Sequence, residues 1–322
     1  MNKIELLLMR SKIENKIRSY LLKKSFIEVR TPIINKYPDV TPVRQFQTHT
    51  FDTNQNLYLR IAPTEFLKRL IFDGLNCIFE FSVNFRDDCN DSTHLSEFLS
   101  LEIMRKDNDV YDMIELSECL IKDVLEFVYQ HGYNNDFVKS RKNNWPKIVL
   151  RDYLLENYDF YEIDNFEELQ ILYKKICGND ANNIKPMKTK YDFLDAIILK
   201  ISCNYRTPVY IGEFPWYLGG PARPTNDNML FKERYELYYR GIELANMSSN
   251  LTEYKLLLKW YSESLSSKRG IINDECSLDL PLFEVFKYGM PNGAVCGIGL
   301  DRLISLVFSI NDVRKTTSYI GF

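Results

Sequence analysis

The stretch CIFEFSVNFRDDCNDSTHLSEFLSLEIM, residues 77–104, decides the fold of this chain. Residues 78–85 alternate apolar and polar side chains, a pattern that predicts a half-buried strand. The polar segment DDCNDST predicts a loop. The period-two spacing of LSEFLSLEIM then predicts a second strand, with Phe98, Ser100 and Glu102 on one face.

Two side chains of this stretch flank the predicted loop. Arg86 follows the first strand and His94 precedes the second, so a hairpin brings both above the sheet, close to Phe98. This set suits a nucleotide, because arginine binds phosphate with two nitrogens, histidine meets a second phosphate and phenylalanine stacks on a base. Taken alone, the stretch favours the alternative of an edge hairpin with an exposed arginine and histidine.

Composition bounds the class of protein. The chain has 322 residues, 45% hydrophobic and 26% charged, which predicts a globular protein of one large or two small domains. Proteins that bind RNA usually carry an excess of basic residues, and the net charge of −3 shows no such excess here. Seven cysteines without a CxxC pair indicate reduced thiols, a cytoplasmic setting and no structural zinc. Neither a signal peptide nor an apolar run of membrane-spanning length is visible.

Periodicity predicts the remaining elements. Residues 3–24 have apolar residues at helical spacing, with basic residues on the same segment. Residues 26–34 predict one strand. Further strands are expected at 57–62, 208–216 and within 233–246, turning at Gly241, and further helices at 63–74, 110–129, 148–156, 165–176, 191–202, 251–267 and 282–288.

Five segments together resemble one family. FRDD…THLSEFLSLE resembles motif 2 of the class II aminoacyl-tRNA synthetases, VCGIGLDRLISLVF (295–308) resembles motif 3, and RTPIIN (30–35) resembles motif 1. LRIAPTEFLKRL (59–70) and ERYELYYRGIELAN (233–246) narrow the resemblance to the lysyl-type branch. The five occur in the family's order and cover nearly the whole chain.

The resemblance implies an architecture. We expect an α+β fold in which an antiparallel sheet is flanked by helices, forming a single catalytic domain over residues 1–322. Motif 1, with Pro32 at the contact, implies a homodimer. Almost nothing precedes motif 1, so we expect no N-terminal anticodon-binding domain.

The implied chemistry is activation of a carboxylic acid by ATP. The protein must neutralise the triphosphate, align the acid and exclude water. By resemblance, the catalytic residues are Arg86 at the α-phosphate and acyl oxygen, and Arg302 at the γ-phosphate, with His94 assisting. The resemblance also implies that Asp88 and Phe98 contact ATP.

Three further positions complete the implied ATP site. Glu236 and Glu243 lie seven apart and are natural Mg²⁺ ligands beside a triphosphate, or else exposed carboxylates paired with Lys232 or Arg240. Gly299 allows the backbone to approach a ligand. Asp301 reads as an ordinary helix N-cap, so we assign it no catalytic role.

Departures from the lysyl pattern concern the amino-acid pocket. Thr64 replaces the acid that holds the substrate α-amino group, Met104 replaces an aromatic residue, and Asn250 replaces the glutamate that pairs with the substrate's terminal ammonium. A buried ammonium without a carboxylate is costly, so a neutral or polar amino acid fits better than lysine unless Glu102 alone suffices. The pocket residues expected by resemblance are Thr64, Glu102, Met104, Asn246, Ser248, Asn250 and Gly297.

The resemblance is closest to truncated lysyl-tRNA synthetase paralogues, which include ligases that attach (R)-β-lysine to elongation factor P. It predicts an AMP-forming amino-acid ligase that uses ATP and Mg²⁺ and serves a protein or small-molecule acceptor rather than a tRNA. One alternative is an amino-acid-activating enzyme of a specialised biosynthetic pathway; another is a non-catalytic nucleotide-binding regulator. Gly297 matches ordinary synthetases, whereas the β-lysine ligases have alanine there, so α and β amino acids both stay open.

Overall fold

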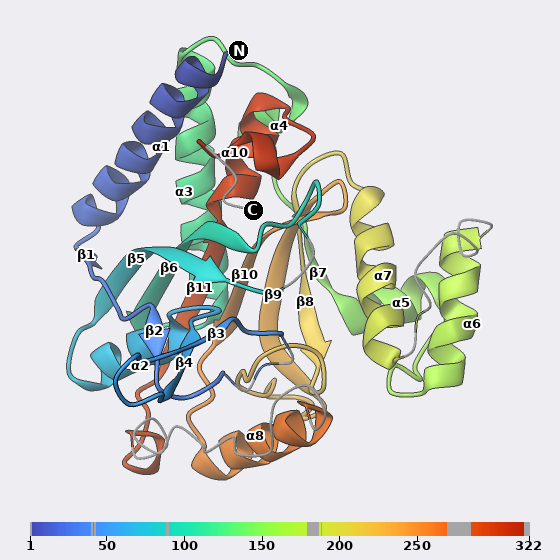
Figure 1. The fold of residues 1–322 in the computed structure, drawn as a ribbon. Coiled ribbons are helices and arrows are strands. Elements are labelled where there is room, and N and C mark those ends of the chain that lie inside the picture. The colour runs from blue at the N-terminus through green and yellow to red at the C-terminus, as the bar shows by residue number, and fades with distance from the viewer. Residues whose placement is uncertain are drawn as a thin grey trace.

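A twisted sheet lies at the centre of the computed structural model, which describes residues 2–39, 41, 43–87, 90–178, 187, 189–268 and 285–318 (Figure 1). Within these residues the sheet has eight strands in the order β1-β5-β6-β11-β10-β9-β8-β7. Their bounds are β1 Ile27–Glu28, β5 Cys77–Phe85, β6 Glu97–Lys106, β7 Lys147–Val149, β8 Val209–Pro215, β9 Phe231–Tyr239, β10 Ile242–Ser249 and β11 Gly293–Gly299.

Most neighbouring strands run antiparallel. The exceptions are the two edges, where β1 pairs with β5 and β7 pairs with β8 in parallel. A separate small sheet has the order β2-β4-β3 and contains β2 (Ile34–Asn35), β3 (Gln47–His49) and β4 (Asn56–Leu59). The expected α+β architecture with a mainly antiparallel sheet is therefore confirmed.

Helices cover the sheet unequally. α1 (Lys3–Lys23), α3 (Val110–Gln130) and α10 (Leu300–Phe308) pack on one face, where their apolar side chains form the main core with the strands. A lobe beside β7 and β8 holds α5 (Leu150–Tyr158), α6 (Phe166–Cys177) and α7 (Lys190–Cys203), while α2 (Thr64–Phe72) and α8 (Tyr254–Lys268) lie toward the opposite face (Figure 1). The short helices are α4 (Asp136–Lys139), η1 (Ser140–Lys142) and η3 (Val313–Lys315).

Two predicted elements differ in the structure. The strand expected at 26–34 is wrong, because only β1 and β2 form there and residues 29–33 separate them. Pro32 has no N–H to donate to a ladder, and the Thr31 hydroxyl donates to Glu80 at 2.7 Å. The helix expected at 148–156 begins two residues later, since Ile148 and Val149 belong to β7.

The other predicted helices and strands are found within a few residues of their expected bounds. Of the helix expected at 282–288, residues 282–284 lie outside the described residues and 285–287 are helical. Among the described residues no helix has the length and apolarity to cross a membrane. The cysteines that the structure describes, at positions 77, 119, 177, 203 and 296, form no disulfide with one another.

Candidate functional site

The face of the sheet opposite α1 and α3 carries a row of polar side chains. Strand pairing places Glu80 beside Glu102, Glu102 beside Gly297, Gly297 beside Asn246, and Asn246 beside Glu236. Directly paired residues point to the same face, so this row crosses five strands on one surface. The expected face of Phe98, Ser100 and Glu102 is therefore continuous with the glutamate of β9.

Arg86 lies at one end of this face, just after β5. Its guanidinium carbon sits 5.0 Å from the centre of the Phe98 ring, a cation–π contact. Its backbone N–H donates to the carbonyl of Ser96 at 2.9 Å, which closes the hairpin loop. The side chain is exposed and makes no ion pair within the described residues, so its hydrogen-bond donors are open to a ligand.

His94 is held by its own loop. Its Nδ1 lies 2.9 Å from the Thr93 hydroxyl and 3.1 Å from Asp91 Oδ1. Partial burial acts to raise the pKa of Asp91, but bonds from Thr93 and His94 lower it to about 2. Because the Asp91 carboxylate fixes Nδ1, the exposed Nε2 is the nitrogen left to meet a ligand.

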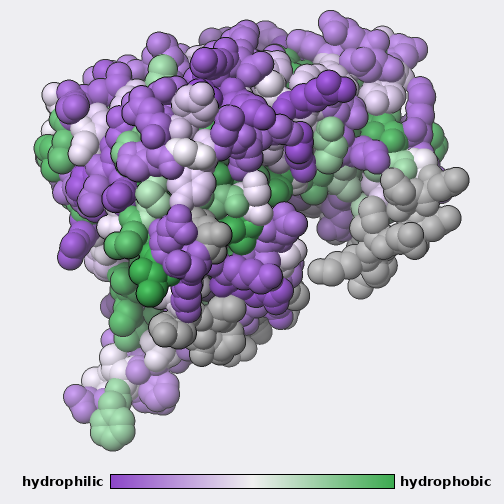
Figure 2. Space-filling model, turned by 90° about the horizontal axis from the view of Figure 1, so that it is seen from above, coloured by the Kyte–Doolittle hydropathy of each residue, from purple (hydrophilic) through white to green (hydrophobic). Residues whose placement is uncertain are grey.

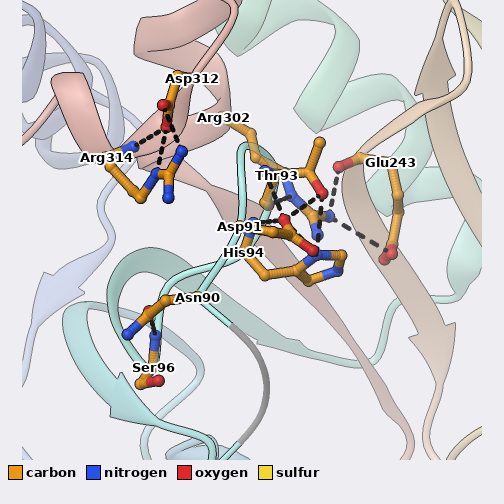
Figure 3. Close-up of polar contacts among 9 residues, drawn as sticks. All are labelled: Asn90, Asp91, Thr93, His94, Ser96, Glu243, Arg302, Asp312 and Arg314. Atoms are coloured by element: carbon orange, nitrogen blue, oxygen red, sulfur yellow. Dashed lines mark hydrogen bonds and ion pairs between the residues drawn. The ribbon is translucent and has the colours of Figure 1, made fainter.

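Arg302 comes from α10 and reaches the same loop. Its Nη1 donates to the carbonyl of Glu243 at 2.7 Å and lies 3.6 Å from that residue's carboxylate, and its Nε donates to the carbonyl of Thr93 at 3.3 Å. Figure 3 shows the guanidinium between the loop and the Glu243 strand. The structure thus brings Arg86, His94, Arg302 and Glu243 to one end of the sheet.

Asp301 has a different role from the predicted one. The N-cap of α10 is Gly299, and Asp301 is the second helical residue. Its carboxylate accepts from Arg10 at 2.7 Å and from the backbone N–H of Leu99 at 2.8 Å. The N-cap prediction is wrong. Asp301 instead bonds α10 to α1 and β6, and this fixes the position of the helical turn that carries Arg302.

A bulge determines which face of the sheet the two glutamates of the β9–β10 hairpin point to. Glu243 pairs with Tyr238 and Asn246 pairs with Glu236, with a register shift between Glu243 and Ala245. Without the extra residue, positions 243 and 246 would point to opposite faces. The bulge therefore places Glu236 and Glu243 on the same surface, as a shared Mg²⁺ site requires.

Glu236 is surrounded by donors. Arg234 and Tyr238 each donate to one of its oxygens, and Asn246 Nδ2 donates at 3.0 Å. Burial, together with the charge of Glu243, raises its pKa above the ordinary value, while Arg234 opposes the shift. The alternative ion pairs for these glutamates are wrong, since Arg240 pairs with Asp136 and Lys232 with backbone carbonyls.

Glu102 is buried without a cation at ion-pair distance among the described residues. Its cross-strand neighbour Glu80 is neutralised by Arg60 at 2.8 Å, but Glu102 accepts only from the Ser100 hydroxyl, at 2.7 Å. Burial raises its pKa to about 7, against the opposing effects of that bond and of Arg86. A ligand that brings an ammonium group would therefore find an unpaired carboxylate here.

Gly297 makes room for that carboxylate. A Cβ at this position would lie 2.9 Å and 3.0 Å from the two Glu102 oxygens. Gly299 is less restricted, because a Cβ there would meet Arg302 side-chain carbons at ordinary contact distance, 3.6 Å. The glycine at 297 is thus coupled to Glu102, whereas the one at 299 serves as the helix cap.

The pocket continues along β6, β11 and β10, away from the arginines. Met104 is fully buried in a cluster with Leu67 and Ile71 of α2, so it closes one flank. Thr64 is the first residue of α2 and is half-buried. Ser248 pairs with Arg234 and is half-buried on the open side.

The Gly/Pro-rich segment 216–230 folds over this end. The Lys232 ammonium is fully buried and donates to the carbonyls of Trp216, Gly219 and Gly220, at 3.3, 3.2 and 2.7 Å. Burial lowers the pKa of Lys232 well below its ordinary value. A Cβ on Gly219 would overlap the Arg234 guanidinium, so the segment lies directly on the site.

Asn250 follows β10 at the far end of the pocket. It is 3% exposed, its N–H donates to the carbonyl of Gly293 at 2.8 Å, and its side-chain oxygen and nitrogen are buried without a hydrogen-bond partner. Asp88 lies outside the described residues.

Sequence reasoning missed several residues that support the site. The partners that no motif signalled are Arg60, Glu80, Asp91, Thr93 and Arg234. The charge of Arg60 within LYLRIA was the available signal for the first pair, because a buried arginine needs a carboxylate.

Known proteins resemble this chain along almost its whole length. The sequence profile described as tRNA synthetases class II (D, K and N) matches residues 2–320. The lysine–tRNA ligase of Wigglesworthia glossinidia brevipalpis is 30% identical over 94% of this chain and 62% of its own length. Lysine–tRNA ligase 2 of Methanosarcina acetivorans is 31% identical over 97% and 61%, and the lysine–tRNA ligase of Mycoplasma genitalium is 30% identical over 98% and 64%. The chain spans little more than three-fifths of the length of these relatives.

Proposed function

The chain belongs to the tRNA synthetases of class II (D, K and N), and from this premise we propose that it activates an amino acid with ATP, forming an aminoacyl-adenylate and pyrophosphate. The observation that carries the proposal is that two arginines, from segments more than 200 residues apart, are bonded to one loop. The backbone N–H of Arg86 donates to Ser96, and the guanidinium of Arg302 donates to Thr93.

In the reaction, a carboxylate oxygen of the amino acid attacks the α-phosphorus of ATP, and the bond to pyrophosphate breaks. Arg86 faces the α-phosphate and the acyl oxygen, where it offsets the charge of the transition state. Phe98 stacks on the adenine and Asp88 contacts it, with Gly299 letting the backbone approach. Arg302 binds the γ-phosphate, and His94 donates to the triphosphate from Nε2 in its imidazolium form, since Nδ1–H is bonded to Asp91.

Mg²⁺ fits beside these groups. Magnesium prefers one or two carboxylates together with substrate phosphates, and Glu236 and Glu243 share a face next to Arg302. When bound, the ion offsets triphosphate charge. Glu243 is the more accessible of the two, with 37% of its side chain exposed, so we assign it the direct contact and Glu236 the second position.

The amino acid lies along the strands from Arg86 toward Asn250. Glu102 accepts its α-ammonium, since Thr64 offers no charge for that task and no described residue places a cation at ion-pair distance from the Glu102 carboxylate. Asn246, Gly297, Ser248 and Met104 shape the space between Glu102 and Asn250. A side chain other than that of lysine is favoured, because Asn250 offers no negative charge to a terminal ammonium.

We infer that the acceptor is a protein lysine or a small molecule rather than a tRNA. Attack of the acceptor's nitrogen or oxygen on the acyl carbon forms the product and releases AMP. The net charge of −3 supports this, because tRNA binding draws on many positive side chains. The lysine–tRNA ligase relatives support a ligase of this kind, for which we propose a cytoplasmic setting.

The test is ATP–pyrophosphate exchange with purified protein and Mg²⁺, run against the common α-amino acids and β-lysine isomers. Exchange that depends on one compound is expected. Exchange with none, under conditions in which ATP binds, would contradict the proposal and favour a non-catalytic nucleotide-binding protein. Acylation of tRNA at a rate comparable to adenylate formation would contradict the proposed acceptor.

We also propose that the protein acts as a homodimer through the motif 1 region. Ile27, Ile33 and Ile34 are 50%, 41% and 53% exposed, and Figure 2 shows hydrophobic side chains gathered along one flank of the molecule. Such a patch marks an interface in most globular proteins. Sedimentation analysis should give a dimer, and Ile34→Lys should weaken its self-association at least tenfold; a monomeric wild-type protein at micromolar concentration would contradict the assignment.

A further inference from the structure

Asn250 is a buried carboxamide whose hydrogen bonds are not made by the protein. Within the described residues, neither Oδ1 nor Nδ2 has a partner, although the residue is only 3% exposed. Asn84 on the same face is equally buried, yet it bonds to Ser82 and Ser100 at 2.6 and 2.8 Å. A buried polar group without a partner destabilises a fold, so its retention calls for a ligand that supplies the missing bonds.

The position of this amide is set by the strands of the site. Its backbone is bonded to Gly293, and a Cβ on that glycine would lie 3.1 Å from Nδ2. Side chains 246, 248 and 250 alternate onto one face, so the Asn250 amide lies on the surface that carries Asn246 and Glu236. It is therefore at the end of the proposed amino-acid pocket, where the substrate side chain ends.

The basic side chains around this end disfavour a substrate ammonium. Arg234 and the buried Lys232 share this face of β9, and the acid beside them, Glu236, is already bonded to Arg234. A substrate ammonium would lie there without a counter-charge. A substrate carboxylate would meet Nδ2 favourably but would also face the Asn250 oxygen.

A second buried donor without a partner lies in the adjoining cluster. Trp216 Nε1 has no hydrogen bond among the described residues, and its ring packs with the cluster that contains Leu251, the residue after Asn250. This end of the pocket thus offers two N–H donors and one carbonyl acceptor. A group with a C=O and an NH₂ matches that set, whereas a hydrocarbon leaves all three atoms unsatisfied.

Resting on the proposed amino-acid activation, we propose that the substrate carries a carboxamide or ureido group at the end of a side chain at least as long as that of glutamine. Asn250 donates to its carbonyl and accepts from its NH₂. A long side chain is favoured, because Asn250 lies four residues, or about 13 Å, beyond Asn246 along the strand, and the Glu102 and Asn250 side chains cover only part of that separation.

The test is ATP–pyrophosphate exchange with glutamine, citrulline, asparagine, lysine, glutamate and norleucine. Glutamine or citrulline should have a kcat/KM at least about 100-fold above lysine, glutamate and norleucine, and above asparagine by a smaller margin. Lysine, glutamate or norleucine as the best substrate would overturn this inference and leave amino-acid activation intact. Exchange with no amino acid would contradict both.

Two variants separate recognition from folding. Asn250→Leu should lower kcat/KM for the carboxamide substrate about 100-fold, with a Tm equal to or above that of the wild type, since no protein hydrogen bond is lost. Asn84→Leu, the matched control, should lower the Tm because it strips Ser82 and Ser100 of their partner. An equal loss of Tm in both variants would show that Asn250 is bonded within the protein and would overturn the inference.

Discussion

The two ends of the site use their charges in opposite ways. At the Arg86 end, one guanidinium stacks on Phe98 and the other is held mainly by carbonyls, so both keep donors for a ligand. At the Asn250 end, Arg234 is bonded to Glu236 and Lys232 to three carbonyls, and the unpartnered group is neutral. The phosphate end is thus arranged for general nucleotide chemistry, and specificity is concentrated at the other end.

The largest expected effect tests the phosphate end. Arg302→Ala should lower kcat for pyrophosphate exchange about 1,000-fold, because a preorganised cation acting on transition-state charge is removed. Arg314→Ala is the matched control, since Arg314 lies near the same loop but pairs with Asp312 (Figure 3). Steady-state exchange kinetics measure both, and equal effects would contradict the role of Arg302.

The next largest effect is expected from a substitution at Gly297, which lies between the two ends of the site. Gly297→Ala should lower kcat/KM for the amino acid about 100-fold while KM for ATP changes little, because the new methyl displaces the Glu102 carboxylate. A loss of this size corresponds to about 2.7 kcal/mol. Gly220→Ala is the control, as a Cβ there meets nothing within 4 Å. If the first variant keeps full activity, Glu102 does not bind the α-ammonium.

A smaller effect concerns the metal. Glu243→Gln should raise the Mg²⁺ concentration needed for half-maximal exchange about tenfold, since one carboxylate of the cation site is lost. Glu97→Gln changes an exposed carboxylate of β6 outside the row of site residues and should leave the requirement unchanged. A Mg²⁺ titration of the exchange rate measures the difference, and identical titrations would exclude Glu243 as a ligand.

An effect of similar size is a pH dependence at Glu102. Its pKa of about 7 means that the carboxylate is protonated in acid and charged above neutrality. Because the folded pKa is raised, the associated stability is present below the unfolded value and is lost as pH rises through about 7. The value of kcat/KM for the amino acid should rise about tenfold from pH 6 to 8, and Glu102→Gln should abolish the rise.

A flat profile in the wild-type protein would contradict that assignment. A slope retained in Glu102→Gln would instead assign the titration to another group, for example the substrate's own ammonium or Glu236.

The sequence predicted the elements that follow a strict period. The β5–β6 hairpin, α1 and α3 are confirmed close to their expected bounds, because alternation and helical spacing report burial directly. The short strands β1 and β2 were predicted as one, since the apolar run continues through residues where the backbone leaves the sheet. Local sequence patterns do not predict that break between β1 and β2.

Contacts between residues far apart in the sequence could not be predicted from local sequence patterns. The bulge after Glu243, the bond of Arg10 to Asp301 and the carbonyls around Lys232 each depend on how separate segments pack. The sequence marks Asn250 as a missing carboxylate, but only the folded chain shows that its side-chain amide has no hydrogen-bond partner among the described residues. The residue types of the site were thus predictable, and their internal bonds were not.

The most direct test of the contrast between the two ends is lysine-dependent pyrophosphate exchange by the wild-type protein, measured beside glutamine and citrulline in the same preparation. We expect exchange with a carboxamide or ureido amino acid and none above background with lysine. Exchange with lysine at a comparable kcat/KM would show that the Asn250 end still accepts an ammonium, and would contradict the proposed carboxamide specificity.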